Sequence, residues 1–179
     1  ELIIEVKIMD KLLTVVIPSY NVEKFLNQTL DSFVCDEAVM KKFEVIVVDD
    51  GSKDNTAKIG KEYADKYPDT FRVISKENGG HGSTINCGIR NAVGKYFKVV
   101  DGDDWVNTAD FVKLVEDLEK TESEYVFTNY NEYYDDVNRQ KAVDFPQFKD
   151  GTEYDFADVA NKVYIPMHAL VIKTSVLKD

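Results

Sequence analysis

Two short acidic segments are the part of this sequence best suited to chemistry. The segment Asp101-Gly102-Asp103-Asp104 places three carboxylates within four residues, and Asp49-Asp50-Gly51-Ser52 adds two more. Neighbouring carboxylates repel one another unless a cation offsets their charge. Hard divalent cations such as Mg²⁺ or Mn²⁺ prefer oxygen ligands, commonly one or two carboxylates together with substrate phosphates. The spacing therefore predicts a divalent metal site that binds a diphosphate-bearing substrate.

Each acidic segment also has a plainer interpretation. The segment Asp49-Asp50-Gly51-Ser52 is typical of a turn that enters a helix, in which Gly51 takes a positive φ and Ser52 or Asp54 caps the helix. The segment that starts at Asp101 is also compatible with a merely acidic surface, because the chain carries 33 acidic against 22 basic residues.

A glycine-rich loop from Asn78 to Gly82 is the third candidate segment. It begins like a dinucleotide-binding fingerprint, but Ile85 stands where the third glycine is required, which argues against an oxidoreductase of the Rossmann type. We expect the loop either to present backbone N–H groups at a helix N-terminus or to be a flexible connection. His81 and His168 are the only histidines, and neither has a ligand-spaced neighbour that would favour a zinc site.

Strands and helices alternate along the part of the chain that carries these segments. Short apolar runs predict the strands, and apolar residues at helical spacing predict a helix after each of the first four. This alternation indicates an α/β protein with a largely parallel, Rossmann-like sheet that helices flank on both faces. The expected strands are 13–17, 43–48, 71–74, 96–100 and 125–128.

The carboxyl ends of parallel strands meet at one edge of a sheet, and open α/β folds bind their ligands there. We therefore expect the loops after the first four strands to converge. Tyr20 is expected to stack on a nucleobase or to fill the crevice wall, and Trp105 to pack under the acidic loop. The residues expected at this edge are Pro18, Ser19, Tyr20, Asn21, Asp49, Asp50, Asn78, Gly80, Asp101, Gly102, Asp103 and Asp104.

The pattern weakens beyond Tyr130. We expect a hairpin across 130–143, a helix near 156–163, a strand at 169–172 and a helix that begins at Thr174-Ser175 and is soon truncated. Tyrosines in this part are candidates for an acceptor groove, with a surface that another domain covers as the alternative. They are Tyr130, Tyr133, Tyr134 and Tyr164.

Composition and charge narrow the class of protein. The 179 residues suffice for one domain, and no apolar run approaches the roughly 18 residues of a membrane span. The formal net charge of −11 argues against nucleic acid as a partner. Cys35 and Cys87 are too few and too far apart for a disulfide scaffold. We expect a cytoplasmic protein, with peripheral attachment to the inner face of the membrane as a variant of that expectation.

Four motifs in unbroken order resemble the family 2 glycosyltransferases of GT-A fold. The resemblance runs from about Leu12 to Trp105 and continues more weakly to Lys173. Its motifs are the segment Leu13 to Asn21, the segment Val47 to Thr56 with its Asp-Asp-Gly-Ser pattern, Asn78-Gly79, and Gly94-Lys95-Tyr96 followed by Asp101 to Asp104.

The resemblance implies an inverting transferase that moves a sugar from a nucleotide diphosphate sugar, most often a UDP-sugar, to a hydroxyl. The acceptor would be a glycan, a lipid-linked molecule or another hydroxyl compound, as in polysaccharide biosynthesis. A bound Mg²⁺ or Mn²⁺ would neutralise charge that develops on the leaving diphosphate. Residues 12–129 would form the nucleotide-sugar-binding core, 130–179 the start of an acceptor-side region, and 1–11 an N-terminal extension or edge strand.

Individual roles follow from the matched motifs. Asp101 and Asp103 would hold the metal, and Asp103 and Asp104 are the catalytic candidates. The general base that deprotonates the acceptor is expected beyond Asp179, with His168 as the alternative within the chain. The remaining donor-binding candidates are Pro18, Ser19, Tyr20 near the base, Asn21, Asp50 on the base, Asn78, Gly80 and Gly102.

Two other functions compete with turnover by this chain. The first is a donor-binding fragment that holds nucleotide without transferring sugar, because the base is not found within these residues. The second is a phosphoacceptor receiver domain of a signalling protein. In that domain Asp49 and Asp50 would bind Mg²⁺, Asp101 would be phosphorylated and Thr128 would end the following strand.

Overall fold

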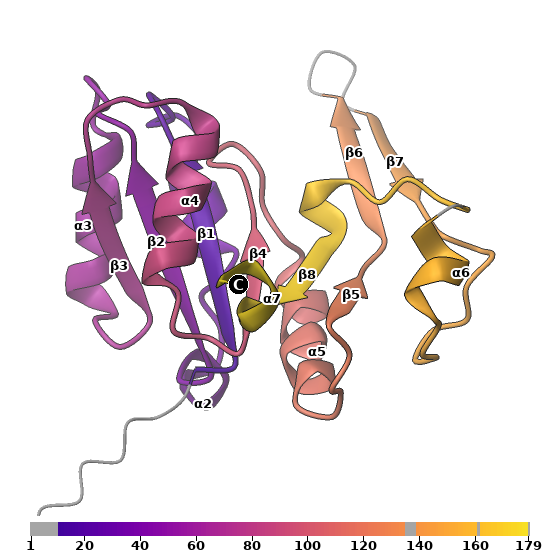
Figure 1. The fold of residues 1–179 in the computed structure, drawn as a ribbon. Helices are drawn as coiled ribbons and strands as arrows, with labels where there is room; N and C mark the ends of the chain where they lie inside the picture. The colour runs from indigo at the N-terminus through magenta and orange to yellow at the C-terminus, as the bar shows by residue number, and fades with distance from the viewer. Residues whose placement is uncertain (1–10, 135–138, 161, 179) are drawn as a thin grey trace, which may run out of the picture.

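The computed structural model describes residues 11–134, 139–160 and 162–178. The extension expected at 1–11 therefore falls, apart from Lys11, outside the described residues. The strands of the main sheet are β1 (Leu13–Ser19), β2 (Phe43–Asp49), β3 (Phe71–Ser75), β4 (Tyr96–Val99), β5 (Tyr125–Phe127) and β8 (Leu170–Lys173). They lie in the order β3-β2-β1-β4-β8-β5 (Figure 1).

Helices cover both faces of this sheet, as the alternation predicted (Figure 1). One core joins α1, α3 and α5 to the sheet, and a second core joins α4 and α7 to the opposite face. Because both faces are covered, β1 and β2 are buried at every position. The helices are α1 (Leu26–Asp31), α2 (Glu37–Met40), α3 (Thr56–Lys66), α4 (His81–Asn91), α5 (Thr108–Leu118), α6 (Phe156–Ala160) and α7 (Thr174–Lys178).

The strand β8 is the main departure from a parallel sheet. It lies between β4 and β5 and is antiparallel to both. The reason is the path of the chain, because β5 ends at the carboxyl edge and the following hairpin of β6 (Tyr130–Tyr134) and β7 (Arg139–Val143) forms a separate sheet. The segment that begins after residue 129 thus returns a strand to the core sheet.

One helix differs in length from the expectation, and another was not expected. The helix expected near 156–163 is described over Phe156–Ala160, and residue 161 lies outside the described part. The helix α2 was not predicted, because four residues are too few to show a period. Asp36 caps it, and its carboxylate accepts a hydrogen bond from Ala38 N at 2.8 Å.

A buried carboxylate, that of Glu44, joins several segments at the edge of the sheet where the parallel strands begin. Glu44 Oε1 accepts hydrogen bonds from Thr14 Oγ1 at 2.6 Å and Val93 N at 3.0 Å, and Oε2 accepts one from Arg72 Nε at 2.9 Å. Thr14 Oγ1 in turn accepts from Gly94 N at 2.9 Å. This network holds the loop before β4 against β1, and so sets where β4 starts and where its acidic end lies.

Candidate active site

Backbone hydrogen bonds join the strand ends that the sequence predicted to converge. Asp50 N donates to Ser19 O at 2.9 Å, which links the end of β2 to the end of β1. Gly102 N donates to Pro18 O at 3.2 Å, which links the turn after β4 to the same strand. The loops after β1, β2 and β4 therefore meet at one edge of the sheet.

Hydrogen bonds hold the loop after β1 against the segment that follows β2. Asn21, in the left-handed region at φ 54°, donates its N–H to Ser52 Oγ at 3.0 Å and accepts from Lys53 N at 2.9 Å. Asp54 accepts from Glu23 N at 3.1 Å and from Thr56 N at 2.9 Å. The expected turn and helix entry is thus present, and it also fixes the path of the first loop.

Asp50 is the buried centre of this edge and is only 2% exposed. Its Oδ1 accepts from Lys76 Nζ and from Gly79 N at 3.0 Å, and its Oδ2 accepts from Gly80 N at 2.8 Å. Burial raises the pKa of Asp50, but these hydrogen bonds and the charge of Lys76 outweigh it, so the pKa lies below its ordinary value. Asp50 therefore holds the glycine-rich loop as a charged anchor.

Asn is expected to be a poor replacement for Asp50. The neutral amide would leave Lys76 without its charged partner. It would also point an N–H₂ group, which is a donor, at the donors of the glycine-rich loop, Gly79 N and Gly80 N. Asp50→Asn should therefore lower the free energy of unfolding by about 3 kcal/mol near pH 7. Because the folded pKa is lowered, this stabilisation is present above the ordinary pKa of 3.8 and is lost as the pH falls through the lower folded value.

Urea unfolding of the wild type and Asp50→Asn across this pH range measures the difference. The gap between the two proteins should narrow below the ordinary pKa of 3.8. The exposed carboxylate Asp65, which pairs with Lys61 at 3.0 Å, is the control, and Asp65→Asn should change stability by less than about 0.5 kcal/mol. Equal effects of the two substitutions would refute the anchor role of Asp50.

The acidic turn after β4 is held tightly against β1. A Cβ on Gly102 would lie 3.0 Å from Pro18 O and 2.9 Å from Val22 Cγ2, so the close approach requires glycine. Asp104 N donates to Asp101 O at 3.0 Å within the turn. His81, the first residue of α4, places Nε2 at 2.7 Å from Asp101 Oδ1. The glycine-rich loop and the acidic turn are therefore in contact.

The electrostatics of the turn suit a cation. The pKa of Asp104 is raised by burial and by the charges of Asp103 and Asp101, while His168 lowers it. Among the residues that the structure describes, no three His, Cys, Asp or Glu side chains are grouped so that they could hold a metal ion by themselves. A divalent ion held by one or two carboxylates and completed by a diphosphate fits this donor set.

The other predicted site residues at this edge differ in exposure, because Pro18 and Ser19 are buried at the end of β1. Tyr20 is 48% exposed, and Asn78 and Asp103 are also exposed. Trp105 differs from the expectation, because it is 43% exposed and packs edge-on against Tyr133 of β6, with ring centroids 5.5 Å apart. It braces the hairpin against the turn, and it does not lie buried beneath the acidic loop.

Sequence reasoning missed Lys76. Its ammonium contacts Asp50, Ser83 Oγ at 2.9 Å and Glu77 O at 2.6 Å, and so ties β3 to the start of α4. A lysine directly after a strand that ends at the predicted site edge was the available signal, because a buried aspartate at that edge needs a cationic partner.

A match to a known family identifies the family to which this chain belongs. A family model described as "Glycosyl transferase family 2" matches residues 14–179, which is nearly the whole chain. The chain belongs to glycosyl transferase family 2. The resemblance drawn from the four motifs is thereby confirmed, and the signalling receiver domain is not supported.

Curated relatives of this family 2 chain carry matching names. EpsJ of Bacillus subtilis, an uncharacterized glycosyltransferase, is 38% identical over 118 residues, which is 66% of this chain and 33% of EpsJ. GgaB of the same species, a minor teichoic acid biosynthesis protein, is 33% identical over 111 residues, 62% of this chain and 12% of GgaB. The chain thus spans a third or less of these two relatives.

Solved structures share the fold of the family 2 chain. TarS residues 1–349 of S. aureus has a TM-score of 0.75 and 26% identity, covering 94% of this chain and 48% of that one. The mannosyltransferase PcManGT of Pyrobaculum calidifontis, in complex with GDP-Man and Mn²⁺, has a TM-score of 0.65 and 21% identity, covering 93% of this chain and 45% of that one. These neighbours are GT-A glycosyltransferases, which confirms the predicted fold.

None of the helices in the described part of the chain has both the length and the apolar character that a membrane span requires.

Proposed function

We propose that this chain binds the donor of an inverting glycosyltransferase that moves a sugar from a UDP-sugar to an acceptor hydroxyl. The observation that carries the proposal is the contact between the loop after β3 and the acidic turn after β4, through His81 and Asp101 at 2.7 Å. A pyrophosphate at this junction would lie near the N-terminus of α4, whose dipole favours negative charge, and near carboxylates suited to a cation.

The nucleoside is proposed to lie beside the β1 and β2 loops. A carboxylate offers about four lone-pair sites, and Asp50 uses three of them for Lys76, Gly79 and Gly80. The remaining position, on Oδ2, is proposed to accept an N–H of the base. Tyr20, half exposed on the neighbouring loop, supplies a ring for stacking. The exposed Asn21 and the backbone of Pro18 and Ser19, whose side chains are buried, are proposed to complete this side of the nucleoside site.

Asp101 and Asp103 are proposed to hold Mg²⁺ or Mn²⁺. When bound, the ion supplies Lewis-acid stabilisation of the negative charge on the departing diphosphate. Gly102 keeps the turn close to β1, so the carboxylates of Asp103 and Asp104 stay at the strand end where the donor is expected. The base that takes the proton of the acceptor hydroxyl is proposed to come from beyond Asp179, and the isolated chain would then bind donor with little or no turnover.

Thermal unfolding with a panel of nucleotides tests this proposal. With Mn²⁺, saturating UDP and UDP-sugars should raise the Tm by roughly 5 °C, GDP should do so less, and each effect should shrink when chelator replaces the metal. The PcManGT complex with GDP-Man makes guanosine the alternative nucleoside. A panel in which no nucleotide raises the Tm would contradict donor binding, and efficient transfer by residues 1–179 would contradict the absence of the base.

A further inference from the structure

Three side chains from the C-terminal part of the chain gather beside the acidic turn. The rings of Tyr130 and His168 are in edge-to-face contact, with centroids 4.5 Å apart and an interplanar angle of 78°. Because Tyr130 belongs to β6, this ring contact places His168 against the hairpin strand that also carries Glu132. Tyr130 and Glu132 share one face of β6, because alternate residues of a strand point to the same side.

The backbone that carries His168 is fixed by an unusual buried lysine. Lys98 of β4 is only 5% exposed, and its Nζ donates to His168 O at 2.6 Å. Burial lowers the pKa of Lys98 to about 8. Thr128 N also donates to Ala169 O at 2.9 Å. The short 3-10 helix Met167–Ala169 is therefore tied to β4 and β5, while the His168 side chain stays exposed.

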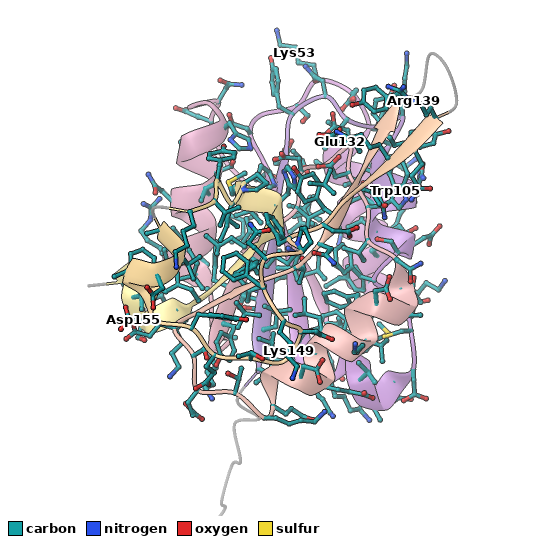
Figure 2. The ribbon with its side chains drawn as sticks, turned by 90° about the vertical axis from the view of Figure 1, so that its right-hand side faces the viewer. Lys53, Trp105, Glu132, Arg139, Lys149 and Asp155 are labelled. Carbon is teal, nitrogen blue, oxygen red and sulfur yellow. The ribbon has the colours of Figure 1, made fainter. Side chains whose placement is uncertain are left out.

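The hairpin that carries Tyr130 and Glu132 is also held in place. Tyr133, on the opposite face of β6, packs against Trp105 directly after the acidic turn. Glu132 accepts hydrogen bonds from Tyr134 Oη at 2.7 Å and from Lys141 Nζ at 3.3 Å. Figure 2 looks onto this side of the molecule and labels Trp105 and Glu132 beside the hairpin.

We propose that Tyr130, Glu132 and His168 form the subsite for the acceptor hydroxyl, and that it binds a neutral saccharide. The inference rests on the proposed donor function, because it assumes that the nucleotide lies at the β1 and β2 loops. The acceptor would then lie on the other side of the acidic turn, beside the hairpin. A phenol, a carboxylate and an imidazole together donate and accept hydrogen bonds, as a polyhydroxyl ligand requires. Tyr130 also offers aromatic surface to the C–H face of a sugar ring.

The local charge favours a neutral acceptor over a phosphodiester. Asp103, Asp104 and Glu132 are all carboxylates, and the nearby cations already have partners. Lys141 pairs with Glu132 at 3.3 Å, Arg139 lies 4.6 Å from the centroid of the Tyr134 ring, and Lys98 donates to His168 O at 2.6 Å. A polyol phosphate chain would add negative charge beside these groups and beside the diphosphate of the donor. A sugar hydroxyl adds none.

Imidazole NMR tests the subsite directly, since the chain has only two histidines. Substituting each with Gln assigns the two signals. With Mg²⁺, UDP should shift His81, which contacts Asp101. Neutral trisaccharides ending in glucose, galactose or N-acetylglucosamine should then be titrated, and at least one should shift His168 saturably. A ribitol phosphate oligomer should leave His168 unchanged.

The outcomes separate this inference from the proposed donor function. If UDP shifts His81 but no trisaccharide shifts His168, the acceptor subsite is wrong and donor binding stands. If only the ribitol phosphate oligomer shifts His168, the neutral acceptor is wrong. If UDP leaves His81 unchanged, donor binding at this edge is itself wrong, whatever the saccharides do.

Substitutions add a quantitative test with the same saccharide. Tyr130→Ala and His168→Ala should weaken its binding at least about tenfold, with UDP affinity within about twofold of the wild type. Tyr154, a tyrosine that is 42% exposed and belongs to no proposed site, is the matched control, and Tyr154→Ala should change neither affinity. Unchanged saccharide affinity in both subsite variants would overturn the proposal.

Lys98 is expected to act as a positioning residue behind the subsite. Lys98→Met should move the His168 imidazole signal and weaken saccharide binding, whereas Lys98→Arg should retain both because it keeps a donor toward His168 O. A loss of thermal stability in Lys98→Met without a change in the His168 signal would reduce Lys98 to a purely structural role.

Discussion

Replacing Asp103 by alanine should weaken Mn²⁺-dependent binding of UDP at least about hundredfold. The carboxylate is exposed at the end of β4, in a turn that Gly102 presses against β1. Its loss would remove a proposed metal ligand without disturbing a buried group, so folding should be retained. Calorimetric titration of UDP in the presence of Mn²⁺ measures the effect.

Two comparisons make this result specific to the metal. In chelator, the wild type and Asp103→Ala should bind UDP with the same residual affinity, because neither then has the ion. Asp117, an exposed carboxylate on α5 paired with Lys120 at 3.1 Å, supplies the control variant Asp117→Ala. Wild-type affinity in Asp103→Ala with Mn²⁺ would remove Asp103 from the metal site.

Gly94→Ala should destabilise the fold by at least about 3 kcal/mol and lower the Tm by roughly 10 °C. A Cβ at Gly94 would lie 2.4 Å from Thr14 N and 2.5 Å from Leu13 C, both backbone atoms of β1 that cannot move aside cheaply. The substitution would push the loop before β4 away from β1 and break the bond from Gly94 N to Thr14 Oγ1. Thermal and urea unfolding measure the loss.

Gly82→Ala is the matched control for Gly94→Ala. A Cβ at Gly82, in the first turn of α4, would meet no atom within 4 Å. Alanine favours helix over glycine, so this variant should be as stable as the wild type or slightly more stable. If the two variants unfold at the same temperature, the close contact between the β4 loop and β1 does not limit stability.

The parallel strands and the residues at their ends were predictable because their signal is local. The apolar runs at β1 and β2 are continuous, so each strand and its polar end could be placed within one or two residues. Strand ends of a parallel sheet then converge by geometry alone. This is why the loops that carry Ser19, Asp50 and Gly102 could be assigned to one edge before any contact was known.

The antiparallel β8 and the hairpin contacts were not predictable in the same way. The apolar run 169–172 indicates a strand, observed as β8, but carries no information on its direction or its neighbours. Trp105 was expected beneath the acidic loop, but its partner Tyr133 lies 28 residues along the chain in the separate sheet. Such pairings depend on chain path, which short-range patterns do not encode.

For Asp50, the motif implies a ligand contact, whereas the structure shows which protein groups its carboxylate already binds. The motif implies a contact with the nucleobase, and this stays a prediction. The structure adds that Lys76, Gly79 and Gly80 occupy three positions on the carboxylate. A sequence pattern names the residue but not how many of its hydrogen-bonding positions remain for a ligand.

A crystal structure of the chain with Mn²⁺ and UDP tests the donor site most directly. Anomalous scattering should place manganese against both Asp101 and Asp103 and in contact with the diphosphate, with uracil beside Tyr20 and Asp50. Manganese located elsewhere, or a diphosphate that does not contact the turn from Asp101 to Asp104, would contradict the account.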